Sequence, residues 1–388
     1  YTKFGDIPYT TKVLSIKESM SIARTAKATV IANVLADLDE VINGNYLPTS
    51  YDADNKGRIT RWAAMAIKAK IYLFEGNWTQ VKNITSTIMT EGGFKLFGSY
   101  AGLFEIANEY NSEVILDAQY RPTSREHQMM YVFLPPTLGG YSQLSPLQEL
   151  VDSYIMLDGK TIKETGTSFD ESHPYANRDP RLKATVMYTG NSYTLADGTE
   201  VVINCEKGEG KDGYGVGSDC SATGYYIKKY WDNTYRATLY SGLNPILIRY
   251  ADILLMNAEA LAELGELDKT AWDATIKPIR DRAGFTLASA LEFPEGASKD
   301  KLIEIVRNER RSELALEGHR HKDIIRWRIA DNVLNGWCHG LKTNDVVGTD
   351  DGYVRVENRT FNANRHYLWP IPQAERDLNG NLEQNPNW

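Results

Sequence analysis

The sequence predicts a mainly α-helical protein: a scaffold of tetratricopeptide-like helix pairs, an α-α superhelix, with a loop-rich insertion that contains short β-strands. Three observations support this class. Apolar residues recur at helical spacing in the first and last thirds of the chain. Clusters of glycine, proline, serine and asparagine separate short β-type runs in the middle third. A helical pattern that ends in glycine and is followed by a tryptophan occurs twice, at 69–78 and at 258–272, as in tetratricopeptide helix pairs.

The first part of the scaffold, residues 1–93, is expected to hold three helices. The first spans 21–42, where valine and leucine recur on one face. The second, 61–75, is rich in alanine, which lets a neighbouring helix approach closely. The third spans 79–89, and Asn77 is its expected N-cap.

Residues 94–244 form the predicted loop-rich, ligand-binding part. Two runs within it, 113–120 and 184–188, have the composition of strands. The stretch 205–224 contains six glycines in 20 residues. Because long irregular segments in compact proteins are usually functional or disordered, we expect ligand contacts in this part.

Residues 245–340 continue the helical scaffold, and 341–388 are expected to form an extended C-terminal tail of the same single domain. Glycines that follow the apolar patterns, and Ser298 as an N-cap, set the expected boundaries. Four helices are expected there, at 246–264, 270–283, 298–316 and 323–334.

Composition excludes several classes of protein. The net charge of −8 argues against a nucleic-acid-binding protein, which usually carries a basic face. No apolar run approaches the roughly 18 residues of a membrane-spanning helix. Three cysteines exclude a disulfide-built scaffold, although Cys205 and Cys220 could close one loop. The 23 tyrosines and 8 tryptophans outnumber the 10 phenylalanines, and such amphipathic rings suit either helix packing or carbohydrate stacking.

No motif of an enzyme or a metal site is complete. The turn 52–57 resembles a calcium loop but lacks the glutamate that would bind the ion bidentately, so a helix-capping turn is favoured and a structural calcium ion remains open. No other cofactor is expected. The acidic side chains of Glu309, Glu313 and Glu317 lie one turn apart, and a catalytic acid–base pair among them would need a cleft and pKa values that differ. Interleaved arginines favour a structural ion-pair network between packed helices instead.

Several motifs, in order, resemble those of the SusD/RagB family. The resemblance runs from Gly5 to Trp388, and no single motif decides it. The motifs are Arg-Asp-Pro-Arg-Leu at 178–182, Ile-Arg-Tyr-Ala-Asp-Ile-Leu-Leu-Met-Asn-Ala-Glu-Ala at 248–260, Ile-Arg-Asp-Arg-Ala-Gly at 279–284, Ile-Val-Arg-Asn-Glu-Arg-Arg-Ser-Glu-Leu-Ala-Leu-Glu-Gly-His-Arg at 305–320, Tyr-Leu-Trp-Pro-Ile-Pro at 367–372 and the segment 381–388.

The resemblance implies a function without chemistry. Proteins of this family are surface lipoproteins of the outer membrane that capture an oligosaccharide, or in some members a peptide, and cover a SusC-type TonB-dependent transporter. The lipoprotein signal, the lipidated cysteine and roughly 150 residues of helices that family members carry do not occur in this sequence. Two rival interpretations are an all-helical glycoside hydrolase and an intracellular helix-pair adaptor.

Ligand contacts in this family come from variable loops, so no binding residue can be transferred from the motifs. The densest aromatic cluster of the insertion offers stacking rings and groups that bond hydroxyls. The rings of residues 225–230 are discounted because a strand there would bury them. The candidate ligand-binding residues are Trp231, Asp232, Asn233, Tyr235, Arg236 and Tyr240, with Tyr214 and Trp337 as weaker candidates.

Overall fold

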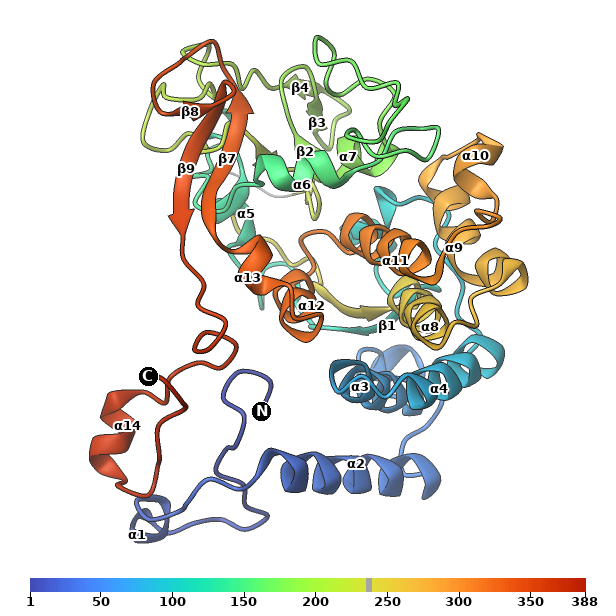
Figure 1. The fold of residues 1–388 in the computed structure, drawn as a ribbon, viewed down its shortest axis with the longest axis vertical. Helices are drawn as coiled ribbons and strands as arrows, with labels where there is room; N and C mark the ends of the chain where they lie inside the picture. Colours follow the sequence, from blue (N-terminus) through green and yellow to red (C-terminus); the bar gives the residue numbers. More distant parts are fainter. Residues whose placement is uncertain (235–238) are drawn as a thin grey trace.

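A computed structural model describes residues 1–234 and 239–388 (Figure 1). Helices pack in succession across the scaffold: α3 on α4, α4 on α8, and α8 on both α9 and α11. Helix α2 lies along α3 at the outer edge of this stack. The scaffold helices are α2 (Lys27–Asn43), α3 (Arg61–Phe74), α4 (Trp78–Glu91), α8 (Tyr250–Leu264), α9 (Lys269–Ala283) and α11 (Lys299–Glu313).

Side-chain caps set where these helices begin. The side chains of Asn77 and Ser298 accept hydrogen bonds from backbone N–H groups in the first turns of α4 and α11, which confirms both predicted N-caps. Helix α8 ends before Gly265, whose φ of 74° is in the left-handed region that favours glycine. In the polar turn at 52–57, Asp52 caps a 3₁₀ turn, η1 (Ala53–Asn55), as the capping interpretation predicts.

The central helix, α8, is surrounded on all sides. Its residues from Ala251 to Ala262 are all buried, including the charged Asp252 and Glu259. One face packs with α3 and α4 in one hydrophobic cluster, and the other packs with α9 and α11 in a second. A helix buried all round needs internal partners for its charged groups.

The predicted helix at 246–264 begins later than expected. Residues Ile246–Arg249 form strand β6, which pairs antiparallel with β1 (Val114–Asp117). The apolar run does not distinguish a strand from a buried helix turn, so periodicity alone placed this boundary four residues too early. Pairing with β1 instead holds Arg249 in an extended conformation immediately before α8.

Small sheets and short helices support the loop-rich part. Strand β2 (Val186–Met187) pairs with β5 (Tyr226–Ile227), and β3 (Ser192–Thr194) pairs with β4 (Glu200–Val202). The expected strand at 184–188 is therefore shorter, because its first residues belong to α7 (Pro180–Thr185). The other short elements are α1 (Ile16–Ser19), η2 (Gly102–Phe104), η3 (Ile106–Asn108), α5 (Met129–Phe133), η4 (Pro136–Leu138), α6 (Gln148–Ser153) and α10 (Ala288–Leu291).

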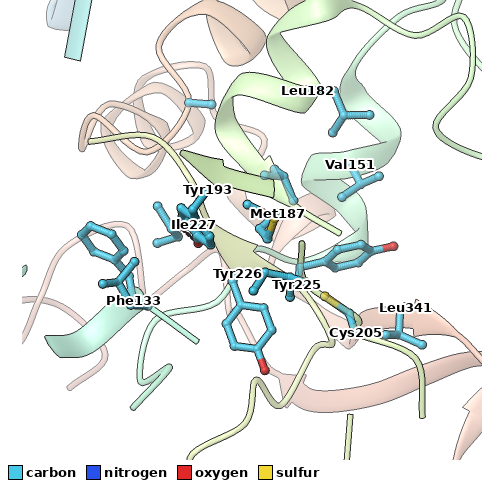
Figure 2. Close-up of a cluster of buried hydrophobic side chains, with 14 of the residues drawn as sticks. Phe133, Val151, Leu182, Met187, Tyr193, Cys205, Tyr225, Tyr226, Ile227 and Leu341 are labelled. Carbon is cyan, nitrogen blue, oxygen red and sulfur yellow. Dashed lines mark hydrogen bonds between the residues drawn. The ribbon is translucent and has the colours of Figure 1, made fainter. Parts of the chain in front are cut away.

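A separate hydrophobic core lies beneath these loops (Figure 2). Tyr193, Tyr225 and Tyr226 are fully buried in it, beside Val151, Leu182 and Met187. The side chains at 225–227 are thus core residues, as the sequence indicated. Cys205 also lies in this core, and it, Cys220 and Cys338 are all free thiols.

The C-terminal stretch is more structured than an extended tail. A three-stranded sheet of β7 (Gly336–Lys342), β8 (Thr349–Asp350) and β9 (Tyr353–Arg359) is followed by α14 (Gln373–Leu378). The predicted helix at 323–334 is split into α12 (Arg320–Arg326) and α13 (Ala330–Val333), because Arg328 between them adopts a φ of 57°.

The two ends of the chain lie together (Figure 1). The Trp369 N–H donates to the Lys3 carbonyl at 2.7 Å, and the Arg24 guanidinium donates to Asn385 Oδ1 at 2.7 Å. Within the described chain, no helix is both long and apolar enough to cross a membrane.

Candidate functional site

A buried network of ionic side chains holds the loop-rich part on the scaffold. At its centre, Glu313 of α11 accepts hydrogen bonds from Arg181 at 2.8 Å, from Arg249 at 2.6 Å and from Arg282. None of these side chains is more than 4% exposed. Arg181 comes from α7 in the insertion, Arg249 from the end of β6 and Arg282 from α9, so one carboxylate joins three segments.

Lysine 229 extends this network toward the predicted ligand loop. Its ammonium group donates to Glu317 Oε1 at 2.6 Å, to the Tyr100 hydroxyl at 2.9 Å and to the Ala315 carbonyl at 2.9 Å. Burial lowers the pKa of Lys229 to about 8 despite the charge of Glu317. The chain just before Trp231 is therefore anchored in the scaffold.

A second ionic cluster, centred on Arg310 one turn earlier on α11, ties the helices to one another. Arg310 bonds Asp252 at 2.6 Å and Asp323 at 2.9 Å, while Arg326 forms a bidentate pair with Glu259 at 2.6 and 2.7 Å. The Trp327 indole N–H donates to the same Glu259 carboxylate at 2.6 Å. Bidentate guanidinium–carboxylate pairs fix geometry as well as charge.

These carboxylates are unsuited to acid–base chemistry. Burial opposes ionisation of Glu313, but the guanidinium groups of Arg282, Arg249 and Arg181 outweigh it and hold the pKa of Glu313 well below its usual range. The pKa of Glu317 is likewise lowered, against burial, to about 2 by Arg249 and Lys229. An acid catalyst needs a raised pKa and access to substrate, and these groups have neither. The predicted structural role of the glutamates on α11 is confirmed.

The structure separates the predicted ligand residues. Trp231 is half-buried, with its ring 5.0 Å from that of Tyr193 and its indole N–H bonded to the Thr194 carbonyl at 2.9 Å. Asp232 is 2% exposed and accepts from Thr234 Oγ1 at 2.6 Å and Ser241 Oγ at 2.5 Å. The structure thus gives Asp232 a role in holding its own loop, because burial and these bonds occupy the oxygens proposed for sugar hydroxyls.

The remaining predicted residues fall into three groups. Tyr235 and Arg236 lie outside the described residues. Asn233 and Tyr214 are partly buried, and Tyr214 packs on the core of the loop-rich part. Tyr240 and Trp337 present their rings to solvent, with exposed fractions of 43% and 42%, but Trp337 lies on β7 beneath the Arg355 guanidinium. None of these placements tests ligand binding itself.

Tyr240 belongs to a set of neighbouring loops that we call the tyrosine loops: residues 109–112, 118–128, 139–144 and 239–244. Backbone bonds join two of them, because His127 and Ser241 pair as an isolated bridge with two 2.9 Å hydrogen bonds. Leu239 lies 3.8 Å from the position that a Cβ on Gly139 would take, so the third loop also lies close by.

Three half-exposed rings lie on the tyrosine loops. Tyr110 and Tyr141 are 40% and 39% exposed, similar to Tyr240. The Tyr110 hydroxyl donates to Gln119 Oε1 at 2.5 Å, and Tyr141 stacks on Tyr131 with ring centroids 4.2 Å apart. Such rings offer an apolar face to a ligand while their hydroxyls remain in water.

Hydrogen bonds of Asn244 connect several of these loop residues. Its Oδ1 accepts from the Tyr120 N–H at 2.6 Å. Its backbone N–H donates to Glu109 Oε1 at 2.7 Å, and its Nδ2 donates to Asp117 at 3.1 Å. Burial raises the pKa of both Glu109 and Asp117. Asn244 and Asp117 are buried and hold the loops together, whereas the partly buried side chains of Glu109 and Gln119 lie on the same loops as the stacking rings.

Sequence reasoning missed Tyr110, Tyr120 and Tyr141. Each stands alone in the sequence, whereas density of aromatic residues selected 225–240. The sequence places these tyrosines beside turn residues in the loop-rich part. That position alone does not predict whether a side chain is exposed. Within the described residues, no group of three or more histidine, cysteine, aspartate or glutamate side chains could hold a metal ion.

The sequence matches a known protein family. The model of the SusD family matches residues 103–388, about three quarters of the chain. The chain belongs to the SusD family. The resemblance seen in the motifs is thereby confirmed.

Related sequences come from two organisms. The chain is 28% identical to the SusD-like protein P25 of Formosa agariphila, in an alignment that covers 85% of this chain and 61% of that protein. It is 26% identical to the SusD-like protein P2 of the same organism, covering 98% and 69%. A SusD-like protein of Bacteroides ovatus is 24% identical, covering 78% and 53%. The chain thus spans about three fifths of the length of the first relative.

Solved structures show the same fold. A SusD-like carbohydrate binding protein from Bacteroides fragilis matches with a TM-score of 0.87 and 28% identity, over 98% of this chain and 76% of that one. A second SusD-like protein of Bacteroides fragilis matches with a TM-score of 0.83 and 28% identity, over 100% of this chain and 76% of that one. These SusD folds confirm the predicted fold class.

Proposed function

We propose that this SusD family protein binds oligosaccharides, without cleaving them, through its tyrosine loops. The observation that carries the proposal is the set of half-exposed rings of Tyr110, Tyr141 and Tyr240, on loops that also hold the partly buried Gln119 and Glu109. A sugar ring needs an apolar face to stack on and acceptors for its hydroxyls, and these loops supply both. The solved relative from Bacteroides fragilis is itself described as a carbohydrate binding protein.

A binding role without catalysis fits the ionisable groups. The carboxylates of the helical scaffold are buried in ion pairs whose arginines lower their pKa values. Asp117 is buried beside Asn244 rather than exposed across a cleft. Hydrolysis of a glycosidic bond requires two accessible carboxyl groups on opposite sides of the bond.

The proposal extends to the place of the protein in the cell. As a SusD family member, it would act at the outer cell surface as a membrane-anchored lipoprotein and pass its ligand to a SusC-type TonB-dependent transporter. Support for this step is family membership. Affinity in the micromolar to millimolar range, about −8 to −4 kcal/mol, suits a ligand that must be released to a transporter.

Calorimetric titration against a panel of neutral oligosaccharides tests the proposal, followed by analysis of the products. One glycan class is expected to bind and to remain intact. Replacement of Tyr240 by alanine is expected to weaken binding by about 1–2 kcal/mol, close to the loss of one aromatic contact, or roughly 5–30-fold. Tyr46→Ala is the matched control, since Tyr46 is 67% exposed and lies after α2, outside the tyrosine loops.

The alternative outcomes separate the rival functions. Binding of peptides with no glycan signal would place the protein in the peptide-binding branch of the family. Release of shorter sugars would show a glycoside hydrolase. Glycan binding that Tyr240→Ala and Tyr110→Ala both leave unchanged would move the site away from the tyrosine loops.

A further inference from the structure

Two arginines of the long helix motif do not take part in the buried ionic network. Arg311 is the residue after Arg310 on α11, and Arg320 is the first residue of α12. Over the described residues, neither guanidinium lies within 4.0 Å of a carboxylate. Arg311 donates instead to the Glu149 carbonyl at 2.5 Å. Arginines that are largely withdrawn from water normally have an anionic partner.

Both side chains line one hollow on the outer face of the scaffold. Its volume is about 520 Å³, which lies within the range of small-molecule sites. The residues from α11 lie one turn apart, so they share a face of that helix. The main lining residues are Arg307, Asn308, Arg311, Arg320, Trp327 and Ile329.

Arg311 and Arg320 bring positive charge to the hollow without a paired carboxylate among the described residues, although three carboxylates also line it. Burial and the charge of Arg320 lower the pKa of Arg311 to about 10, so Arg311 is still protonated at neutral pH, and burial also lowers the pKa of Arg320. Arg307 lies over the Trp327 ring at 4.8 Å and pairs with Glu263 at 2.9 Å, but its Nε is buried without a partner in the described chain. An oxyanion between these groups relieves the repulsion, and guanidinium groups match planar carboxylates.

The acidic residues at the hollow restrict the ligand further. Asp300, Glu263 and Glu304 also line it. Three carboxylates disfavour a polyanion such as a phosphorylated peptide, because like charges repel. They accept hydrogen bonds from hydroxyl groups. The lining therefore suits a molecule with one negative charge and several hydroxyls.

We propose that this hollow is a second binding site, which takes a singly charged, hydroxyl-bearing carboxylate such as a uronic acid residue. Arg311 and Arg320 bind the carboxylate, Arg307 assists, and the acidic residues accept hydroxyls. The site lies on the helical scaffold, and it does not depend on the function proposed for the tyrosine loops.

Saturation-transfer NMR with D-glucuronate tests the proposal, with D-glucose as the neutral control and acetate as the bare carboxylate. D-glucuronate is expected to bind and D-glucose is not. Arg320→Gln and Arg311→Gln are each expected to weaken binding at least tenfold. Arg359→Gln, which changes an arginine in an exposed pair with Glu357 on β9, is expected to leave it unchanged.

Two outcomes would refute the proposal. Acetate binding without D-glucuronate binding refutes the sugar assignment, and D-glucuronate binding that survives both variants refutes the site. Thermal melts check folding. If Arg311→Gln unfolds, Arg320→Gln carries the test, because Arg320 is the first residue of α12 and has no ion pair among the described residues. Neutral oligosaccharide binding measured on Arg320→Gln stays intact, so a failure here is distinguishable from a failure of the tyrosine loops.

Discussion

Replacement of Glu313 by glutamine removes the negative charge at the centre of the buried network. The carboxylate is 0% exposed and bonds Arg181 and Arg249 at 2.8 and 2.6 Å, as well as Arg282. Three guanidinium groups then lose their common counter-charge, although Arg181 keeps Asp179 and Arg249 keeps Glu317. Breaking a buried ion pair on one side typically costs about 3–5 kcal/mol, a large share of the about 5–15 kcal/mol that stabilise a domain.

The size of the expected shift follows from chain length. With an unfolding entropy of about 2.1 cal/mol/K per residue, a chain of this length loses about 5 °C in Tm for a loss of about 4 kcal/mol. Calorimetric melts at pH 7 measure this shift, and urea titration measures the free energy of unfolding. Glu304→Gln is the control, because that side chain lies on the same helix, is 62% exposed and pairs with Lys301. A Glu313→Gln protein that melts with the wild type refutes the role of the network.

The remaining predictions concern a histidine, a glycine and the cysteines. Both ring nitrogens of His339 face carboxylates, Glu149 at 2.8 Å and Asp350 at 3.0 Å; burial lowers its pKa, but these hydrogen bonds outweigh burial and raise it above 6.5. Its stabilising effect is therefore complete below about pH 6.5 and lost as pH rises through the folded pKa, so the Tm difference between wild type and His339→Gln should shrink between pH 6 and 9. A difference that stays constant over that range contradicts the bridge. Gly224→Ala should lower the free energy of unfolding by at least about 2 kcal/mol in urea titration, because φ is 75° and the new Cβ would lie 1.8 Å from Leu341 Cδ2. Gly210→Ala, with φ 60° and nothing within 4 Å, should cost about 1 kcal/mol; equal costs would show that the contact with Leu341 is unimportant. Burial raises the pKa of the Cys205 thiol, so iodoacetamide at pH 8 should label the less buried Cys220 well before Cys205, and faster labelling of Cys205 would contradict its burial.

The scaffold was predictable because its signals are local. Helical periodicity, the N-caps at Asn77 and Ser298, and the glycine stop at Gly265 all act within a few residues. Charge alternation on α11 also indicated ion pairing, since arginines lie between the glutamates in the sequence. The partners of Glu313, however, lie 31 to 132 residues away in the sequence, and no local pattern predicts them.

The strand at Ile246–Arg249 shows where local signals fail. Its apolar run suits a helix or a strand, and only pairing with β1, more than a hundred residues earlier, selects the strand. The break between α12 and α13 depends likewise on the positive φ of Arg328, a residue type with no preference for that conformation.

The candidate site was predictable only in part, because exposure depends on tertiary packing. Tyr240 is exposed, whereas Asp232 from the same cluster is buried in hydrogen bonds to its own loop. Tyr110 and Tyr141 come from loops far away in the sequence. The bonds of Asn244 hold the loop of Tyr110 near that of Tyr240, and Leu239 lies beside Gly139 in the loop of Tyr141.

The central claim is that the tyrosine loops bind neutral oligosaccharides. Calorimetric titration of the wild type, Tyr240→Ala and Tyr46→Ala with one binding glycan tests it most directly. Binding weakened roughly 5–30-fold by Tyr240→Ala and left unchanged by Tyr46→Ala is the result that our account predicts. Equal affinity of all three proteins for the glycan would contradict it.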